Sequence, residues 1–294
     1  MQDKQRMTLP TLYADETPKG DTRVPTLKIS PPKKWTSINT HELWNYRELL
    51  YTFIWRDVKV RYKQTVLGFL WVIIQPLFMM VIFTFFFGKL AGIPSDNVPY
   101  PLFVLAALLP WALFSEGITR STLSMVSNAA IMTKVYFPRL IMPLSGVISP
   151  LVDFIMSMSV LVVMMVYYGY VPTLMVVFLP IFIVLAMATS FSVGIWASAL
   201  NVKYRDFQYT IPFLIQIWLF ASPVVYPSSL LPESLQFLYN LNPMVAVIEG
   251  FRWVLLGTEA PGSGTFISVG LVIALLISGL FYFRRMEQYY SDIV

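Results

Sequence analysis

The chain is most constrained by an apolar run from Val66 to Phe87, which contains no charged side chain. A helix of about 20 apolar residues is long enough to cross the roughly 30 Å hydrocarbon core of a bilayer. The whole chain is 56% hydrophobic and only 13% charged, whereas about a quarter of the residues in soluble domains are charged. The run therefore predicts a membrane-spanning helix, and the composition predicts an integral membrane protein.

A basic stretch from Arg56 to Lys63 leads directly into this run. Helical steps of three and four residues would place Arg56, Lys59 and Lys63 on one face and Arg61 on another. Cations at headgroup depth gain about 1 kcal/mol each beside an anionic leaflet, and they could equally bind a lipid pyrophosphate. We expect a pyrophosphate site at Arg56, Lys59 and Lys63, and an ordinary stop-transfer flank remains the alternative.

Residues 40–63 have the pattern of an amphipathic helix with aromatic side chains on its flank. The apolar arc consists of Leu43, Tyr46, Leu49, Leu50, Phe53 and Ile54, and the flank of Trp44, Tyr51 and Trp55. Such a helix is too charged to span a bilayer, so we expect it to lie in the membrane interface. A surface helix of a soluble domain is the alternative. Residues 1–39 are polar and rich in proline, which predicts a disordered cytosolic tail.

Residues 64–294 are expected to form an all-α transmembrane domain with six spans. The five further spans are Pro101 to Ile118, Leu140 to Tyr168, Thr173 to Leu200, Gln208 to Tyr226 and Thr265 to Phe283. Six spans place both termini on one side, and most near-membrane cations fall in the regions on that side. Only Lys89 and Arg252 fall in the opposite loops. The positive-inside rule therefore predicts that both termini are cytosolic.

The last outer loop, after Tyr226, is apolar but is repeatedly interrupted by proline. Its pieces are too short and too charged to cross the membrane, so we expect two short re-entrant helices. Irregular backbone at that depth must be buried in protein or line a cavity, which suggests a gate. The expected gate residues are Pro227, Pro243, Glu249 and Arg252.

Several classes of chemistry are excluded by residue usage. The chain has no cysteine, its single histidine is His41, and no GxxxxGK[ST] phosphate loop occurs. We therefore expect no enzymatic activity and no cofactor bound by this chain, so ATP and Mg²⁺ would be used by a partner subunit. Because the net charge of +5 is concentrated in the predicted cytosolic regions, it does not indicate a nucleic-acid partner.

Four segments carry a family resemblance: RDVKVRYKQTVLGFLW with the following Gln75-Pro76 pair, KVYFPR, NVKYRDF and LNPMVAVIEGFRW. With them, the chain from about Leu49 to Ile293 resembles the permease subunit of ABC-2 type bacterial polysaccharide exporters. The resemblance implies a homodimer that, with two ABC ATPase subunits, exports a lipid-linked polysaccharide, with O-antigen as the expected cargo, across the bacterial inner membrane. Teichoic acid, capsule, drug or lipid export and a non-transporting assembly scaffold remain alternatives.

The resemblance also implies roles for particular residues. Those expected to contact the ATPase are Asn128, Lys134, Tyr136, Phe137 and Arg139 in one loop, and Tyr204, Arg205 and Asp206 in another. Those expected along the glycan path are Trp71, Trp218, Phe220 and Tyr226, although lipid contact is the common role of such aromatics. Independently of the resemblance, Glu116 and Asp153 are charges within the spans near the predicted cytosolic side, so we expect snorkelling or a structural pair with Arg120 or Arg139 rather than a proton relay.

Overall fold

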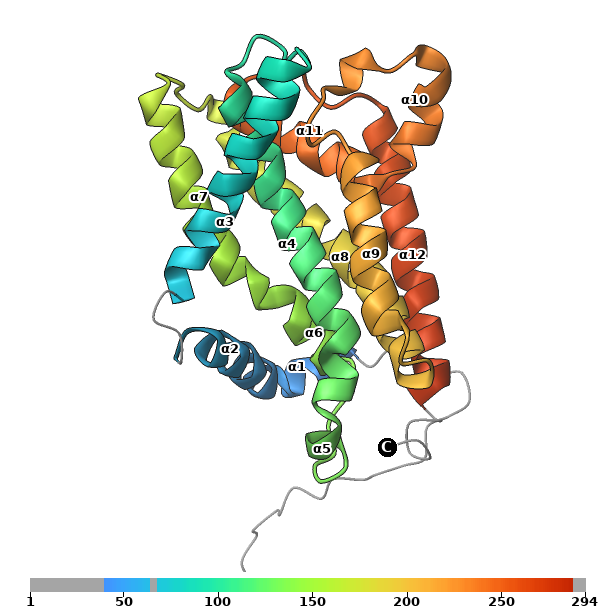
Figure 1. The fold of residues 1–294 in the computed structure, drawn as a ribbon. Helices are drawn as coiled ribbons and strands as arrows, with labels where there is room; N and C mark the ends of the chain where they lie inside the picture. The colour runs from blue at the N-terminus through green and yellow to red at the C-terminus, as the bar shows by residue number, and fades with distance from the viewer. Residues whose placement is uncertain (1–39, 64–67, 288–294) are drawn as a thin grey trace, which may run out of the picture. The chain divides into compact units, whose positions relative to one another are not determined.

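A computed structural model describes residues 40–63 and 68–287, all of which belong to one compact unit (Figure 1). The described residues are helical without any strand, which confirms the all-α prediction. The predicted N-terminal tail lies outside the described residues. The elements are α1 (Thr40–Asn45), α2 (Arg47–Lys63), α3 (Gly68–Phe83), η1 (Thr84–Leu90), α4 (Tyr100–Ser127), α5 (Ala129–Met132), α6 (Ile141–Ile148), α7 (Pro150–Tyr167), η2 (Leu174–Phe178), α8 (Leu179–Lys203), α9 (Phe207–Phe220), η3 (Ser228–Leu230), α10 (Glu233–Asn240), α11 (Pro243–Leu256) and α12 (Gly264–Glu287).

Five helical stretches of the described chain are long and apolar enough to cross a membrane. They are Gly68–Leu90, Tyr100–Ser127, Ile141–Tyr167, Leu174–Lys203 and Gly264–Glu287. The first is α3 continued by the π-helix η1, so the apolar run that dominates the sequence is indeed helical where it is described. These five stretches agree with five of the six predicted spans.

The expected span from Gln208 to Tyr226 is shorter than predicted. Its helix, α9, has 14 residues and ends at Phe220, which at 1.5 Å per residue gives about 21 Å. The chain turns at 221–226 because Pro223 lacks an amide hydrogen and disfavours helical geometry at Ser222 before it. The six-span count therefore stays a prediction.

Two further boundaries differ from those expected. The stretch predicted as one helix from Leu140 to Tyr168 is divided into α6 and α7 at Ser149, because Pro150 begins the second helix. In contrast, α4 continues past Ile118 to Ser127, so the first part of the expected cytosolic loop is helical.

The centre of the fold is the packing of α4 against α8 and α6, where small residues allow close approach. A Cβ built on Gly117 would lie 2.2 Å from Ser190 Oγ, and one on Gly146 would lie 2.8 Å from the Ser121 backbone nitrogen. Ser190 Oγ donates to the carbonyl of Phe114 at 3.2 Å, joining α8 to α4. Close contact and buried hydroxyl bonds thus fix α4 inside the bundle.

The amphipathic helix predicted at 40–63 is present as α1 and α2, and α2 runs crosswise below α3 (Figure 1). Its apolar side packs on protein, since Phe53 is buried 5.7 Å from the ring of Phe137 in a cluster that includes α6, α8 and α12 residues. Trp44, Tyr51 and Trp55 remain exposed. The interfacial location of this helix stays a prediction.

Two short helices, α10 and α11, lie within the predicted outer loop, at the end of the unit opposite α2 (Figure 1). Most of α11 is buried against α4, α8 and α12. Asn242 caps α11 by accepting from the Met244 amide at 3.0 Å, and Gly257 ends it at a φ of 70°. Short helices were predicted here, and their re-entrant character stays a prediction.

Candidate functional site

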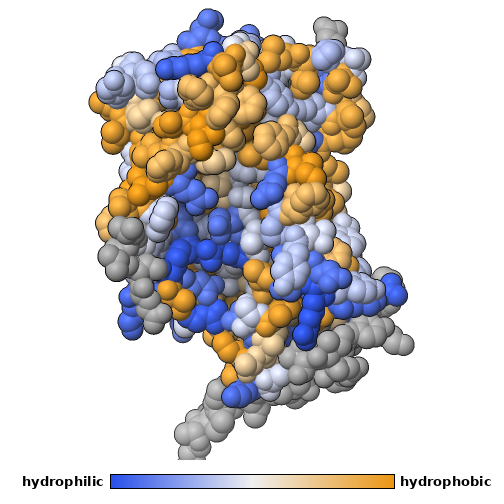
Figure 2. Space-filling view, viewed as in Figure 1, coloured by the Kyte–Doolittle hydropathy of each residue, from blue (hydrophilic) through white to orange (hydrophobic). Residues whose placement is uncertain are grey.

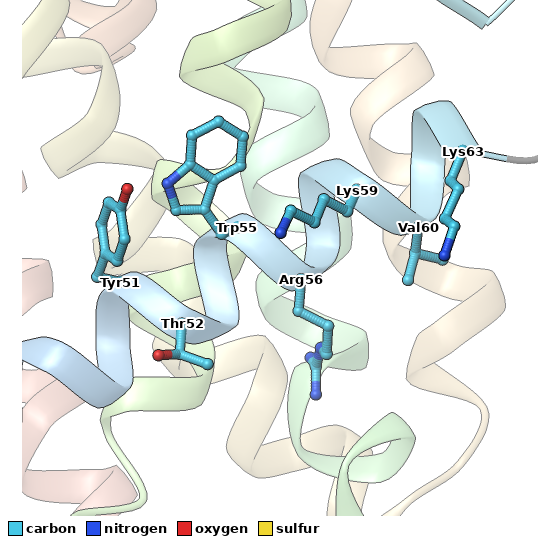
Figure 3. Close-up of a pocket in the computed structure, with 7 residues that line it drawn as sticks. All are labelled: Tyr51, Thr52, Trp55, Arg56, Lys59, Val60 and Lys63. Carbon is cyan, nitrogen blue, oxygen red and sulfur yellow. The ribbon is translucent and has the colours of Figure 1, made fainter.

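An open groove of about 860 Å³ follows one side of α2 (Figure 3). The described side chains that line it all come from this helix: Tyr51, Thr52, Trp55, Arg56, Lys59, Val60 and Lys63. The three cations predicted to share a helix face therefore border a common groove. Two aromatic rings and three cations on one side of a surface helix suit a ligand with an anionic group and an apolar part.

The three cations of the groove differ in their neighbours. Arg56 donates to Asp57 Oδ1 from Nε at 3.0 Å and from Nη2 at 2.7 Å, and its guanidinium lies 4.9 Å from the centre of the Phe53 ring. Lys59 extends toward Trp55, with Nζ 5.9 Å from the ring centre (Figure 3). Asp57 thus offsets part of the charge of Arg56 and holds its guanidinium in place.

A charged cluster lies on another side of α2. Arg61 forms an ion pair with Asp153 of α7, and the Tyr62 hydroxyl donates to the same carboxylate. Burial first, and then the positive charge of Arg120, lower the pKa of the Arg61 guanidinium. Two neighbouring side chains at the end of α2 are thereby fastened to a single carboxylate of α7.

The sequence predicted structural ion pairs for Glu116 and Asp153. The prediction is confirmed for Glu116, whereas the partner expected for Asp153 was wrong. Glu116 pairs with Arg120, Oε2 to Nε, at 2.9 Å. Asp153 pairs with Arg61 rather than with Arg120 or Arg139. Arg139 instead donates from Nη1 to the carbonyl of Glu287 at 2.7 Å, joining the loop before α6 to the end of α12.

Two segments expected to contact an ATPase lie at the same end of the helices as α2 (Figure 1). In the loop after α5, Lys134 is exposed and Tyr136 is 63% exposed, whereas Phe137 is 4% exposed. Phe137 therefore faces Phe53 of α2 rather than solvent. Asn128 and Arg139 are half-buried, with Asn128 Nδ2 donating to the Ser124 carbonyl at 2.7 Å.

In the turn between α8 and α9, Tyr204, Arg205 and Asp206 are all exposed. The Lys203 ammonium lies 5.0 Å from the centre of the Tyr204 ring. Both segments therefore offer an exposed tyrosine ring, a side chain that is enriched at protein interfaces.

The four aromatic residues expected along a glycan path differ in their exposure. Trp71 of α3 and Phe220 of α9 are exposed, but Trp218 donates from Nε1 to Asn242 Oδ1 at 2.9 Å and packs edge-on against Phe114 at 4.9 Å. The Tyr226 hydroxyl donates to the Phe220 carbonyl at 3.1 Å. Trp218 and Tyr226 thus hold the segment between α9 and α11.

Among the expected gate residues, Arg252 has the most defined environment. It is 3% exposed, and its guanidinium donates to the carbonyls of Phe103 at 3.3 Å and Val224 at 3.0 Å. It thereby joins α11 to α4 and to the turn after α9. Pro227 and Pro243 are also buried, and Glu249 is half-buried.

Sequence reasoning missed the attachment of α2 to α7. The Tyr62 and Asp153 partners are 91 positions apart, so neither helical periodicity nor local charge pattern could have linked them. The one available signal was the cost of an unpaired carboxylate in an apolar helix, which requires some partner without identifying it.

Comparison with known proteins identifies the family. A family model of the ABC-2 type transporter matches residues 48–256. The O-antigen export system permease protein RfbA of Myxococcus xanthus is 30% identical over 252 residues, covering 84% of this chain and 96% of that protein. RfbA of Klebsiella pneumoniae is 29% identical over 248 residues, covering 84% and 95%. The polysialic acid transport protein KpsM of Escherichia coli is 23% identical over 240 residues, covering 79% and 91%. The chain belongs to the ABC-2 type transporter family.

Proposed function

We propose that this chain is the membrane subunit of an ATP-driven exporter that moves a lipid-linked O-antigen across the bacterial inner membrane. Two copies would form the channel with two separate ATPase subunits, which bind and hydrolyse ATP with Mg²⁺. The relatives named for O-antigen export, which align with nearly their whole length, support this cargo. The more distant likeness to the polysialic acid transport protein makes a capsular polysaccharide the second candidate.

The proposed topology has six spans, with α9 and its following turn as the fifth. Both termini lie in the cytosol, and α10 and α11 enter the membrane from the outside without crossing it. The strongly basic α2 and the cations near α5 and at the end of α12 support this orientation, because they gather at one end of the helices.

The observation that carries the substrate proposal is the groove of α2, where Arg56, Lys59 and Lys63 lie beside exposed aromatic rings. A pyrophosphate has several acceptor oxygens for such donors, and Trp55 and Tyr51 provide apolar surface for the adjoining lipid chain. We propose that this groove receives the lipid pyrophosphate on the cytosolic side.

We further propose that the ATPase subunits dock on two exposed segments. The first contains Lys134 and Tyr136, with Asn128, Phe137 and Arg139 holding its shape. The second contains Tyr204, Arg205 and Asp206. Movement of the first segment would reach α2 directly, because Phe137 packs against Phe53.

The receiving site is tested by comparing Arg56→Ala and Arg56→Lys with Arg47→Ala. Arg47 is an exposed cation at the beginning of the same helix and outside the groove, so it is a matched control. Arg61 cannot serve as one because it is paired with Asp153. Loss of one charge-assisted donor should weaken binding by about 1.5–3 kcal/mol.

The measurements are the amount of O-antigen reaching the cell surface and the amount of lipid-linked glycan that copurifies with the permease–ATPase complex. Arg56→Ala should reduce both, Arg56→Lys should reduce them less, and Arg47→Ala should leave them near wild type. Equal behaviour of Arg56→Ala and Arg47→Ala would show that the cations of the groove are only a topology signal.

A further inference from the structure

The Glu116–Arg120 ion pair has an unusual place for two charges. It lies within α4, a helix long and apolar enough to cross a membrane, yet the side chains of Arg120 and Glu116 are 34% and 51% exposed. Charged side chains are costly against lipid hydrocarbon, so an exposed pair at this position must face water, headgroups or a polar ligand.

The pair lies near the end of α2. Arg61 of α2 is close enough to Arg120 and Glu116 for both charges to act on its pKa, and Arg61 is itself fixed by Asp153 of α7. Three helices therefore bring two arginines and two carboxylates together. In Figure 2, hydrophilic surface gathers in a hollow in the lower half of this face, where Figure 1 places the region bounded by α2, α3 and α4.

The two ion pairs of this cluster differ in how firmly they are held. Asp153 accepts from both Arg61 and Tyr62 and is mostly buried, so the removal of its partners would leave a stranded charge. Within the described part of the chain, Glu116 accepts one hydrogen bond, from Arg120 Nε to Oε2 at 2.9 Å within the same helix. Exposed pairs of this kind contribute little to stability, so Arg120 can exchange its carboxylate for another anion.

We propose that Arg120 is a second phosphate-binding residue, and that Glu116 occupies the place of the phosphate until a ligand displaces it. The ligand is the pyrophosphate of the lipid-linked glycan, so this inference rests on the proposed function. On binding, the guanidinium transfers its hydrogen bonds from the carboxylate to phosphate oxygens, and the half-exposed Glu116 turns toward solvent. The Arg61–Asp153 pair stays intact and holds α2 beside the site.

The charges of the cluster explain why a placeholder is needed. Two arginines close together repel each other, and the positive charge of Arg120 already lowers the pKa of Arg61. Glu116 offsets this repulsion in the empty transporter, and a dianionic ligand would replace it with more negative charge. Arg56, Lys59 and Lys63 lie on a different side of α2 from Arg61 and Arg120. The pyrophosphate would therefore bind first in the groove and then move to Arg120.

The test is equilibrium binding of a glycan-free polyprenyl pyrophosphate to the permease–ATPase complex in nanodiscs of zwitterionic lipid. Arg120→Ala should raise the Kd about tenfold or more, because a charge-assisted donor is lost. Glu116→Gln should lower the Kd about twofold or more, because the competing carboxylate is removed. Arg47→Ala is the control and should leave the Kd unchanged.

The opposite signs separate this proposal from a purely structural ion pair, for which both substitutions would weaken binding or neither would change it. If Arg120→Ala fails to assemble, tightening by Glu116→Gln still decides the question, and an unchanged or weaker Kd for Glu116→Gln overturns the proposal. Failure of the wild-type complex to bind the polyprenyl pyrophosphate saturably would instead overturn the proposed function.

Two competitors identify the source of the phosphate. Inorganic pyrophosphate should compete only weakly if the polyprenyl chain contributes to binding, and nanodiscs containing phosphatidylglycerol should change the Kd of wild type and Glu116→Gln by the same factor. If phosphatidylglycerol cancels the gain shown by Glu116→Gln, then Arg120 binds bulk anionic lipid and the assignment to the exported lipid is wrong.

Discussion

Replacement of Gly146 by alanine should separate α6 from α4 at the level of the charged cluster. The added Cβ would lie 2.8 Å from the Ser121 nitrogen and 3.0 Å from the Arg120 carbonyl carbon. Both are backbone atoms, so neither can rotate away. Relief of the first contact to an ordinary ~3.5 Å separation requires a shift of about 0.7 Å, enough to weaken neighbouring dispersion contacts as well.

The expected cost of this overpacking is about 1–3 kcal/mol. Replacing glycine by alanine within a helix also stabilises the helix by up to about 1 kcal/mol, because alanine has the higher helix propensity. A control substitution with the same gain is therefore needed. Gly270 of α12 provides it, since a Cβ there meets nothing within 4 Å. The difference between Gly146→Ala and Gly270→Ala therefore isolates the collision with α4.

The assay is thermal unfolding of each variant in the same detergent. At roughly 2–4 °C per kcal/mol, Gly146→Ala should unfold about 2–12 °C below Gly270→Ala. Equal midpoints would show that α6 and α4 are not in backbone contact at Arg120 and Ser121. The geometry of the neighbouring Glu116–Arg120 pair would then need to be revised.

Two further predictions concern topology and coupling. The chain has no cysteine of its own, so single cysteines can report orientation. A cysteine that replaces the exposed Ser263 should react with a membrane-impermeant thiol reagent added to spheroplasts, whereas one that replaces Ser127 should not. The reverse labelling would invert the proposed orientation. Tyr136→Ala should weaken ATPase association in a pull-down by about 2 kcal/mol if the ring is an interface anchor. The control Phe137→Leu keeps an apolar side chain at a buried position and should largely retain association. Unchanged association of Tyr136→Ala would place the docking surface elsewhere.

The sequence was sufficient to predict elements whose signals are local. A chargeless run longer than a bilayer core predicts a spanning helix, and α3 with η1 is that helix. Helical spacing alone put Arg56, Lys59 and Lys63 on one side of α2, and the three side chains line one groove. The four residues left between the spans predicted at 140–168 and 173–200 also lie between α7 and η2.

Helix ends were harder to predict because hydrophobicity continues where the backbone cannot remain helical. The apolar stretch from Gln208 to Tyr226 contains no charge, but Pro223 near its end removes a hydrogen-bond donor and the helix stops at Phe220. The reverse happened in α4. Its polar residues after Ile118 suggested a loop, although Thr122 donates to the Ile118 carbonyl within α4 and Asn201 of α8 donates to the Thr122 carbonyl.

Long-range contacts set the remaining limit, and Arg252 shows how they alter an inference from charge. The sequence places Arg252 in an outer loop, where it counts against the positive-inside bias. The structure buries it in α11 with carbonyl partners on α4 and after α9, so it reports on packing rather than on the aqueous side. Of the two cations first assigned to the outer loops, only Lys89 is exposed. The positive-inside rule counts loop charges as the chain enters the membrane, before Arg252 is buried, so the prediction of cytosolic termini rests on the sequence count as it stands.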